Sequence, residues 1–156
     1  ENGTITAASS SSINDGAAAL LMMTESHAKK IGARPIARLV GHATHAQQPE
    51  WFSTAPVGAV AKLFKKTGWT VKDVDLWEVN EAFAVVPMAL MHELDVSHEI
   101  VNVNGGACAL GHPIGASGAR IMVTLIHALK ARGKKRGVAT LCIGGGEGTA
   151  VALELL

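Results

Sequence analysis

The sequence predicts an α/β fold, in which a mixed five-stranded sheet, mostly parallel with an antiparallel last strand, carries helices on both faces. Short apolar runs alternate along the chain with segments whose apolar residues recur at helical spacing. Glycine accounts for 17 of the 156 residues and stands where many of these segments end, as tight turns and helix ends require.

The first 34 residues are predicted to hold a loop, one strand and one helix. Residues 1–12 show no periodicity and include four consecutive serines. The apolar run 17–23 follows the turn signal Asn14-Asp15-Gly16, and its shortness favours a buried strand over a helix. Residues 25–31 are predicted to be helical, with Gly32 at the C-terminal end.

The remaining chain alternates between strands and helices. The predicted strands span residues 36–46, 75–79, 100–103, 138–143 and 149–155. The predicted helices span residues 57–66, 82–94 and 114–132. Three consecutive glycines, 144–146, join the last two strands, so this pair is predicted to be antiparallel.

Composition excludes several classes of protein. A net charge of +1, an aromatic content of 4% and the lack of Tyr argue against a nucleic-acid partner. No apolar run reaches the roughly 20 residues of a membrane helix, and no signal peptide opens the sequence, so we expect no membrane partner. Two cysteines exclude a disulfide scaffold and suit the cytoplasm. Because the sequence begins with Glu1 rather than Met, we expect part of a longer protein.

Common phosphate and metal motifs do not occur in the sequence. It has neither a Gly-x-Gly-x-x-Gly pattern nor a Gly-Lys-Ser/Thr loop. His42 and His45 lack Cys or carboxylate partners at zinc-ligand spacing, so we expect no metal site. The segment 115–119 misses the Gly-x-Ser-x-Gly nucleophile elbow by one residue, and its small side chains predict close packing of a helix on the sheet.

Three segments with polar or nucleophilic side chains follow predicted strands. They are residues 80–83, 104–118 and 142–146. Ligands of open α/β sheets bind beyond the carboxyl ends of parallel strands. We therefore expect these segments to meet at one site.

His112 stands between Gly111 and Pro113, directly before the longest predicted helix. Pro113 restricts the backbone of His112 to extended conformations, and the helix N-terminus disfavours a protonated ring. A neutral imidazole there can accept a proton. The alternative is a loop histidine with a structural role at an interface.

Cys142 and Asn80 each allow two interpretations. Cys142 is either an inert core thiol or a reactive group beside glycines whose free N–H groups can bind an oxyanion. Asn80 either caps the following helix or holds a water molecule or a substrate carbonyl. Cys108 lacks the glycine-rich setting of Cys142 and is expected to pack in the core.

The same segments carry a resemblance to a known family. Over essentially all 156 residues the chain resembles the C-terminal portion of thiolases, most closely the acetyl-CoA acetyltransferase type. The matching motifs are Ser-Ser-Ile-Asn-Asp-Gly-Ala-Ala-Ala (11–19), Asn-Glu-Ala-Phe (80–83), Asn-Gly-Gly through Gly-His-Pro-Ile-Gly-Ala-Ser-Gly (104–118) and Cys-Ile-Gly-Gly-Gly (142–146).

The resemblance implies reversible Claisen condensation and thiolysis of 3-ketoacyl-CoA, with coenzyme A thioesters as substrates and no resident cofactor. It implies that His112 activates a nucleophilic cysteine and that Asn80 positions a water in an oxyanion hole. Cys142 would move the proton alpha to the thioester carbonyl, and Gly144 would donate its N–H to a second oxyanion hole. Ser11, Ala7 and Phe83 match positions along the pantetheine channel.

The resemblance also implies that the fold continues outside these residues. Residues 1–34 match the end of the N-terminal thiolase half, and residues 35–156 match the C-terminal half as a thiolase-like domain. The acylated cysteine and the insertion that binds the CoA nucleotide belong to parts not among these residues, so we expect the 156 residues alone to be inactive. A homo-oligomer, either a dimer or a tetramer, is expected. The serine motif departs from the usual Asn-Ala-Ser-Gly, because residues 9–12 are all Ser.

Two other interpretations compete with the enzyme. A ketosynthase of the wider superfamily is disfavoured, since those proteins usually carry His at the position of Asn80 and lack Cys at 142. The chain could instead be a non-catalytic module that binds CoA or serves assembly. The run 17–23 has no strand partner in the C-terminal half, so we expect another segment or chain to cover it.

Overall fold

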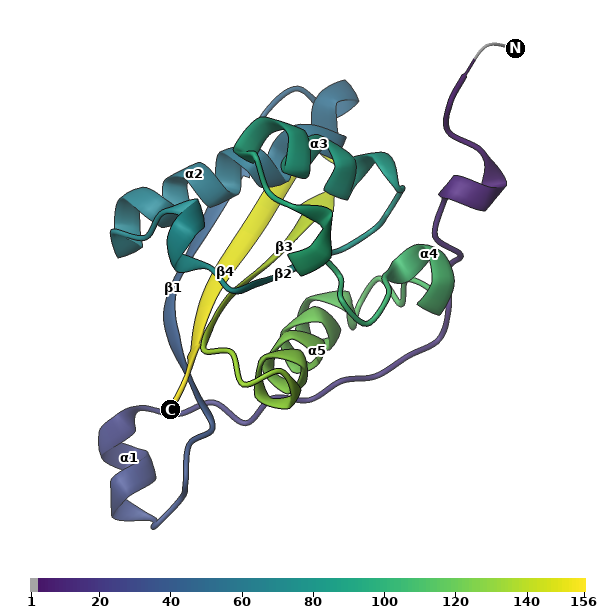
Figure 1. The fold of residues 1–156 in the computed structure, drawn as a ribbon. Helices are drawn as coiled ribbons and strands as arrows, with labels where there is room; N and C mark the ends of the chain where they lie inside the picture. Colours follow the sequence, from purple (N-terminus) through teal and green to yellow (C-terminus); the bar gives the residue numbers. More distant parts are fainter. Residues whose placement is uncertain (1–2) are drawn as a thin grey trace.

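A four-stranded sheet forms the centre of the computed structural model, which describes residues 3–156 (Figure 1). In the order of the sheet, the strands are β1 (Ala37–Ala46), β4 (Glu147–Leu155), β3 (Arg136–Ile143) and β2 (Leu76–Val79). β4 is antiparallel to both β1 and β3, whereas β2 and β3 are parallel. Three strands thus run in one direction and the last runs against them, as predicted.

Helices cover both faces of the sheet, which confirms the predicted α/β class (Figure 1). The α-helices are α1 (Glu25–Lys30), α2 (Ala55–Thr67), α3 (Val85–Leu94), α4 (Ala107–Leu110) and α5 (Ser117–Ala131). Short 3-10 helices span Ala7–Ser9, Pro49–Thr54, Val71–Asp73 and His98–Ile100. Gly68, with φ of +74°, ends α2 in the left-handed conformation that favours glycine.

Two apolar clusters hold these layers together. Leu63 of α2 and Leu90 of α3 pack with Trp77 on one face of the sheet. Leu125 and the other buried residues of α5 pack with Leu76 on the opposite face. Neighbouring residues of a strand point to opposite faces, so β2 contributes to both clusters.

The predicted fifth strand at residues 100–103 is wrong. This segment follows the 3-10 helix His98–Ile100 and forms a single bridge, between Val101 and Trp77. Asn102 then adopts a φ of +47° and ends the extended segment. Its side chain accepts from the Val79 N–H and donates to the Val79 carbonyl, both at 2.8 Å, so a side-chain amide satisfies the backbone that a longer strand would have paired.

The predicted strand at residues 17–23 does not form among the described residues. Within the described residues this run pairs with no strand and passes α5 as an irregular thread (Figure 1). Leu20 packs against the α5 cluster, whereas Leu21 is 89% exposed. Among residues 3–156, no neighbouring strand offers its backbone to this run.

Other predicted boundaries differ by a few residues. α3 begins at Val85 rather than at residue 82, because backbone bonds from Ser11 and to Ser9 hold the intervening turn. α5 begins at Ser117 rather than at residue 114. No described helix is both long and apolar enough to cross a bilayer.

Candidate active site

Asn80 directly follows β2 and is fully buried. Its backbone N–H donates to the Thr140 carbonyl of β3 at 2.9 Å, which continues the parallel ladder by one residue. α3 begins at Val85 with Ala84 as its N-cap, so the alternative that Asn80 caps that helix is wrong. The side chain is instead free to bond with residues of the α5 side.

His112 meets Asn80 directly. The His112 Nε2 and Asn80 Nδ2 atoms are 3.3 Å apart, although the two residues are 32 positions apart in sequence. The backbone N–H of His112 donates to the Ser12 carbonyl at 2.8 Å, which ties this loop to the N-terminal segment. Two of the three predicted segments thus come together.

The hydrogen bonds around His112 determine its tautomer. Ser117 Oγ donates to the Pro113 carbonyl at 3.0 Å, so its lone pair faces His112 Nδ1 at 2.6 Å. With the Ser117 hydroxyl donating to Pro113, Nδ1 carries the hydrogen and donates to Ser117, which leaves Nε2 as an acceptor. Asn80 Nδ2 donates to that acceptor.

The pKa of His112 is lowered, in the predicted direction but for other reasons. Burial of the ring is the main cause, and the positive charge of Arg120 is the second. Burial and Arg120 thus both favour the neutral ring that was predicted from the helix N-terminus. An unprotonated Nε2 at neutral pH is what a general base needs.

Cys142 lies on β3, two residues after Thr140, and is 6% exposed. Its thiol packs in the cluster on the side of α2 and α3 and takes no part in the hydrogen bonds that join Asn80 to His112. Burial raises its pKa to about 11. The thiol therefore holds its proton at neutral pH.

Gly144 begins the turn between β3 and β4 and is exposed. A Cβ atom built there would meet no heavy atom within 4 Å. The turn therefore leaves open space next to the strand that carries Cys142.

The predicted channel residues lie on the N-terminal segment and the loop after β2. Ser11 Oγ donates to the Ala82 carbonyl at 3.0 Å, and Ser10 forms a bridge with Phe83. Phe83 also contacts the ring of Phe52 edge-on, with 6.0 Å between centroids. Ala7 is exposed in the 3-10 helix Ala7–Ser9. Ser11 and Phe83 are thus brought to the loop that Asn80 begins.

Three residues that the sequence analysis missed surround this pair. Arg120 of α5 donates from Nη2 to Asn80 Oδ1 at 3.5 Å, and its Nη1 lies 3.5 Å from Glu78 Oε2. Glu78 is 1% exposed. Its pKa is raised to about 7 because burial outweighs the attraction of Arg120, with Glu81 adding to the rise. Ser117, predicted to serve packing alone, is the partner of His112 Nδ1.

A signal for the charged pair exists in the sequence. Glu78 interrupts the apolar strand Leu-Trp-Glu-Val, and Arg120 directly precedes Ile121 on the apolar side of its helix. A charge at such positions is rarely buried without a partner. The two segments are 42 residues apart, so only the fold reveals that they meet.

Glu81 and Cys108 belong to the supporting structure. Glu81 accepts from Asn102 Nδ2 at 2.8 Å and from the Cys108 N–H at 3.0 Å. Cys108 is half-buried in α4 and lies outside both apolar clusters, so the prediction that it packs in the core is wrong. Burial and the charge of Glu81 raise its pKa.

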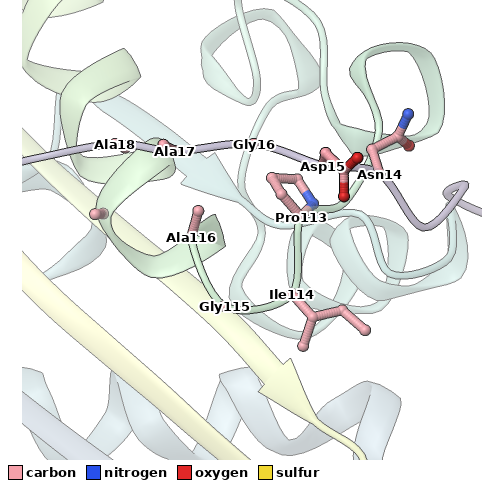
Figure 2. A pocket seen from close by; sticks show the side chains of 10 residues that line it. Asn14, Asp15, Gly16, Ala17, Ala18, Pro113, Ile114, Gly115 and Ala116 are labelled. Carbon is pink, nitrogen blue, oxygen red and sulfur yellow. The ribbon is translucent and has the colours of Figure 1, made fainter.

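A hollow of about 390 Å³ opens beside the His112 loop (Figure 2). It is lined by residues 14–18 of the N-terminal segment and by Pro113–Ala116 and Ala119. Pro113 lies against the segment, and a Cβ atom at Gly16 would come 2.7 Å from its ring. A glycine at this position lets the segment approach the loop of His112. Among the described residues, no group of three or more His, Cys, Asp or Glu side chains could hold a metal ion.

Comparison with known proteins places these features in a family context. The family model for the thiolase C-terminal domain matches residues 33–155, and the one for the thiolase N-terminal domain matches residues 1–26. The chain is 53% identical over 155 residues to a probable acetyl-CoA acetyltransferase of Dictyostelium discoideum, covering 99% of this chain and 37% of that protein. It is 53% identical over 154 residues to an acetyl-CoA acetyltransferase of Escherichia coli, covering 99% and 39%.

Solved structures agree with the sequence matches. The Bacillus anthracis acetyl-CoA acetyltransferase superposes with a TM-score of 0.97 at 47% identity, over 100% of this chain and 40% of that one. The Acat5 thiolase of Ascaris suum, solved with coenzyme A, gives 0.89 at 42% identity, over 99% and 40%. The chain thus spans about 40% of the length of these relatives.

Proposed function

The chain belongs to the thiolase family, and we propose that it is the C-terminal portion of an acyl-CoA C-acyltransferase of the acetyl-CoA acetyltransferase type. The reaction is reversible Claisen condensation and thiolysis of 3-ketoacyl-CoA, with coenzyme A thioesters as substrates and no resident cofactor. The contact between Asn80 Nδ2 and His112 Nε2, at 3.3 Å in a buried setting, carries this proposal.

His112 acts on the thiol nucleophile that the rest of the thiolase supplies. Its unprotonated Nε2 accepts the thiol proton, and the thiolate then attacks the thioester carbonyl and expels the thiolate of coenzyme A. The oxyanion that develops needs donors already in place. His112, once it has taken up the thiol proton, helps to stabilise the oxyanion, and Asn80 positions a water that completes the hole.

Cys142 and Gly144 serve the carbon–carbon bond. Cys142 gives its proton to the expelled thiolate of coenzyme A. With a pKa of about 11, the resulting Cys142 thiolate is a strong base that can accept the proton alpha to the thioester carbonyl of the second substrate. Gly144 would donate its backbone N–H to the enolate oxygen. Ser11, Phe83 and Ala7 line the approach of the pantetheine arm.

The remaining assignments follow the same family context. Residues 1–34 complete the N-terminal thiolase half and residues 35–156 form the C-terminal domain, a division that the two family-model matches support. The rest of the N-terminal half and a second copy of the protein are the expected macromolecular partners. The two free cysteines suit a cytoplasmic location.

The test is acetoacetyl-CoA thiolysis by the full-length protein and its Cys142→Ala variant. We expect kcat to fall at least about 100-fold, because the proton at the alpha carbon loses its acceptor. Cys108→Ala is the matched control, and it should retain turnover because Cys108 lies outside the Asn80–His112 contact. Unchanged turnover in a folded Cys142→Ala protein would instead support the non-catalytic CoA-binding or assembly module.

A further inference from the structure

Behind Asn80 lies a buried ion pair that the proposed chemistry does not use. Arg120 of α5 and Glu78 of β2 have side-chain exposures of 18% and 2%, and Nη1 is 3.5 Å from Oε2. Burying two charges costs several kcal/mol per ion unless geometry and further hydrogen bonds compensate. Apolar residues of similar size would join α5 to β2 as well. The pair therefore calls for an explanation beyond packing.

The hydrogen bonds from Arg120 run in one direction through the site. Arg120 Nη2 donates to Asn80 Oδ1, and Asn80 Nδ2 donates to His112 Nε2. His112 Nδ1 donates to Ser117 Oγ, which donates to the Pro113 carbonyl. A guanidinium can only donate, so it forces the oxygen of the Asn80 amide towards itself and the NH₂ group towards His112.

We propose that Arg120 is a positioning residue, paired with Glu78, that orients the Asn80 amide and thereby keeps His112 in the tautomer whose Nε2 is unprotonated. This inference rests on the acyl transfer proposed above and adds a residue to it. Arg120 does not touch the reacting atoms. It acts through Asn80, whose amide would be free to rotate by half a turn without it.

The charge of Arg120 contributes in the same direction. Together with burial it lowers the pKa of His112, so the ring stays neutral. Arg120 is the charged group that acts on His112, while Glu78 faces Arg120 from β2 and Glu81 bonds to Asn102 and Cys108. Lysine would keep the charge, but its single ammonium lacks the planar fork with which Arg120 reaches both Glu78 and Asn80.

The experiment compares full-length wild type with Arg120→Met and Arg120→Lys. Arg132→Met is the matched control, because Arg132 lies at the other end of α5 and bonds to Asn104 and Val103. The first measurement is the pH dependence of carbethoxylation of His112 by diethyl pyrocarbonate, followed on its peptide by mass spectrometry. The second is the pH profile of kcat and KM for acetoacetyl-CoA thiolysis.

For Arg120→Met we expect the pKa of His112 to rise and the acidic limb of the kcat/KM profile to move to higher pH. We expect kcat to fall about 10- to 100-fold, the usual effect of losing a residue that orients a ligating or reacting side chain. KM for coenzyme A should change little. Arg120→Lys should keep a low pKa at His112 but share the loss in kcat, and Arg132→Met should match wild type.

A purely structural ion pair would give a different pattern. A folded Arg120→Met protein whose His112 pKa and pH profile equal those of wild type overturns the proposal. If that variant does not fold, Arg120→Lys with a wild-type kcat overturns it. Failure of the proposed function shows separately, as a wild-type protein without thiolysis in which the carbethoxylation profile still responds to Arg120.

Discussion

At the scale of single residues, the candidate site is a series of hydrogen bonds that runs from Arg120 through Asn80 and His112 to Ser117. Asn80 could be predicted because it follows a strand, and His112 because it follows a segment resembling one and precedes Pro113, which restricts its backbone. Ser117 could not, because a small residue between glycines in sequence serves packing equally well. Its role depends on the turn at Pro113, which places Oγ 2.6 Å from His112 Nδ1.

Ser117→Ala tests the hydrogen bond between His112 Nδ1 and Ser117 Oγ. The substitution removes the acceptor of the Nδ1 hydrogen and the donor to the Pro113 carbonyl in a residue that is 1% exposed. We expect kcat for thiolysis by the full-length protein to fall about tenfold or more, since the imidazole loses the group that fixes its tautomer. KM for coenzyme A should stay near the wild-type value.

Ser97→Ala is the control for this substitution. Ser97 also makes a short-range bond, from the Glu99 N–H at 3.3 Å, but in an exposed loop. The variant should keep wild-type turnover. Equal kcat values for Ser117→Ala, Ser97→Ala and wild type would contradict the role given to Ser117.

At the scale of elements, most helices and strands could be predicted and two segments could not. α2, β1 and the β3–β4 pair follow periodicity and glycine turns, which are local signals. Residues 100–103 carry the composition of a strand, but the Asn102 side chain takes the place of the backbone ladder. Residues 17–23 are apolar enough for a strand, but a strand needs a neighbour, and sequence composition does not say where that neighbour lies.

Asn102→Ala tests whether the Asn102 side chain takes the place of strand pairing at Val79. It leaves the N–H and the carbonyl of Val79 without partners beside a nearly fully buried residue. We expect the free energy of unfolding to fall by about 2–3 kcal/mol, measured from urea denaturation midpoints of the full-length protein. Asn104→Ala, at an exposed position that bonds to Arg132, should change it by less than about 0.5 kcal/mol.

At the scale of the whole molecule, the charged pair between α5 and β2 makes stability depend on pH. Glu78 has a pKa of about 7 against an ordinary value of 4.5, so the folded state binds this proton more tightly than the unfolded state does. Its contribution to stability is fully present below pH 4.5 and is lost as the pH rises to about 7. The loss is on the order of 3 kcal/mol.

Glu78→Gln should remove this dependence, because Gln does not ionise. Denaturation midpoints of wild type and variant at pH 5 and pH 8 measure it. We expect the variant to gain stability relative to wild type between the two pH values. If the difference in stability between wild type and variant is the same at pH 5 and at pH 8, the raised pKa of Glu78 is contradicted.

The direction of every strand could be predicted from the alternation of elements, but their order across the sheet could not. Connections through helices fix direction, and the glycine turn fixes the final reversal. No local sequence signal predicts that β4 lies between β3 and β1, because the pairing of β1 with β4 joins residues about a hundred positions apart. The cover expected over residues 17–23 stays a prediction.

The interior place of β4 bears on how the chain is made. Its neighbours β1 and β3 do not pair with each other, and each pairs with β4. Residues 147–155 of β4 are synthesised after the other three strands of the sheet. Until β4 is in place, the backbone groups of β1 and β3 that pair with it have no partner strand, and their apolar side chains are exposed to other nascent chains. The sheet can therefore close only after residues 147–155 have been synthesised.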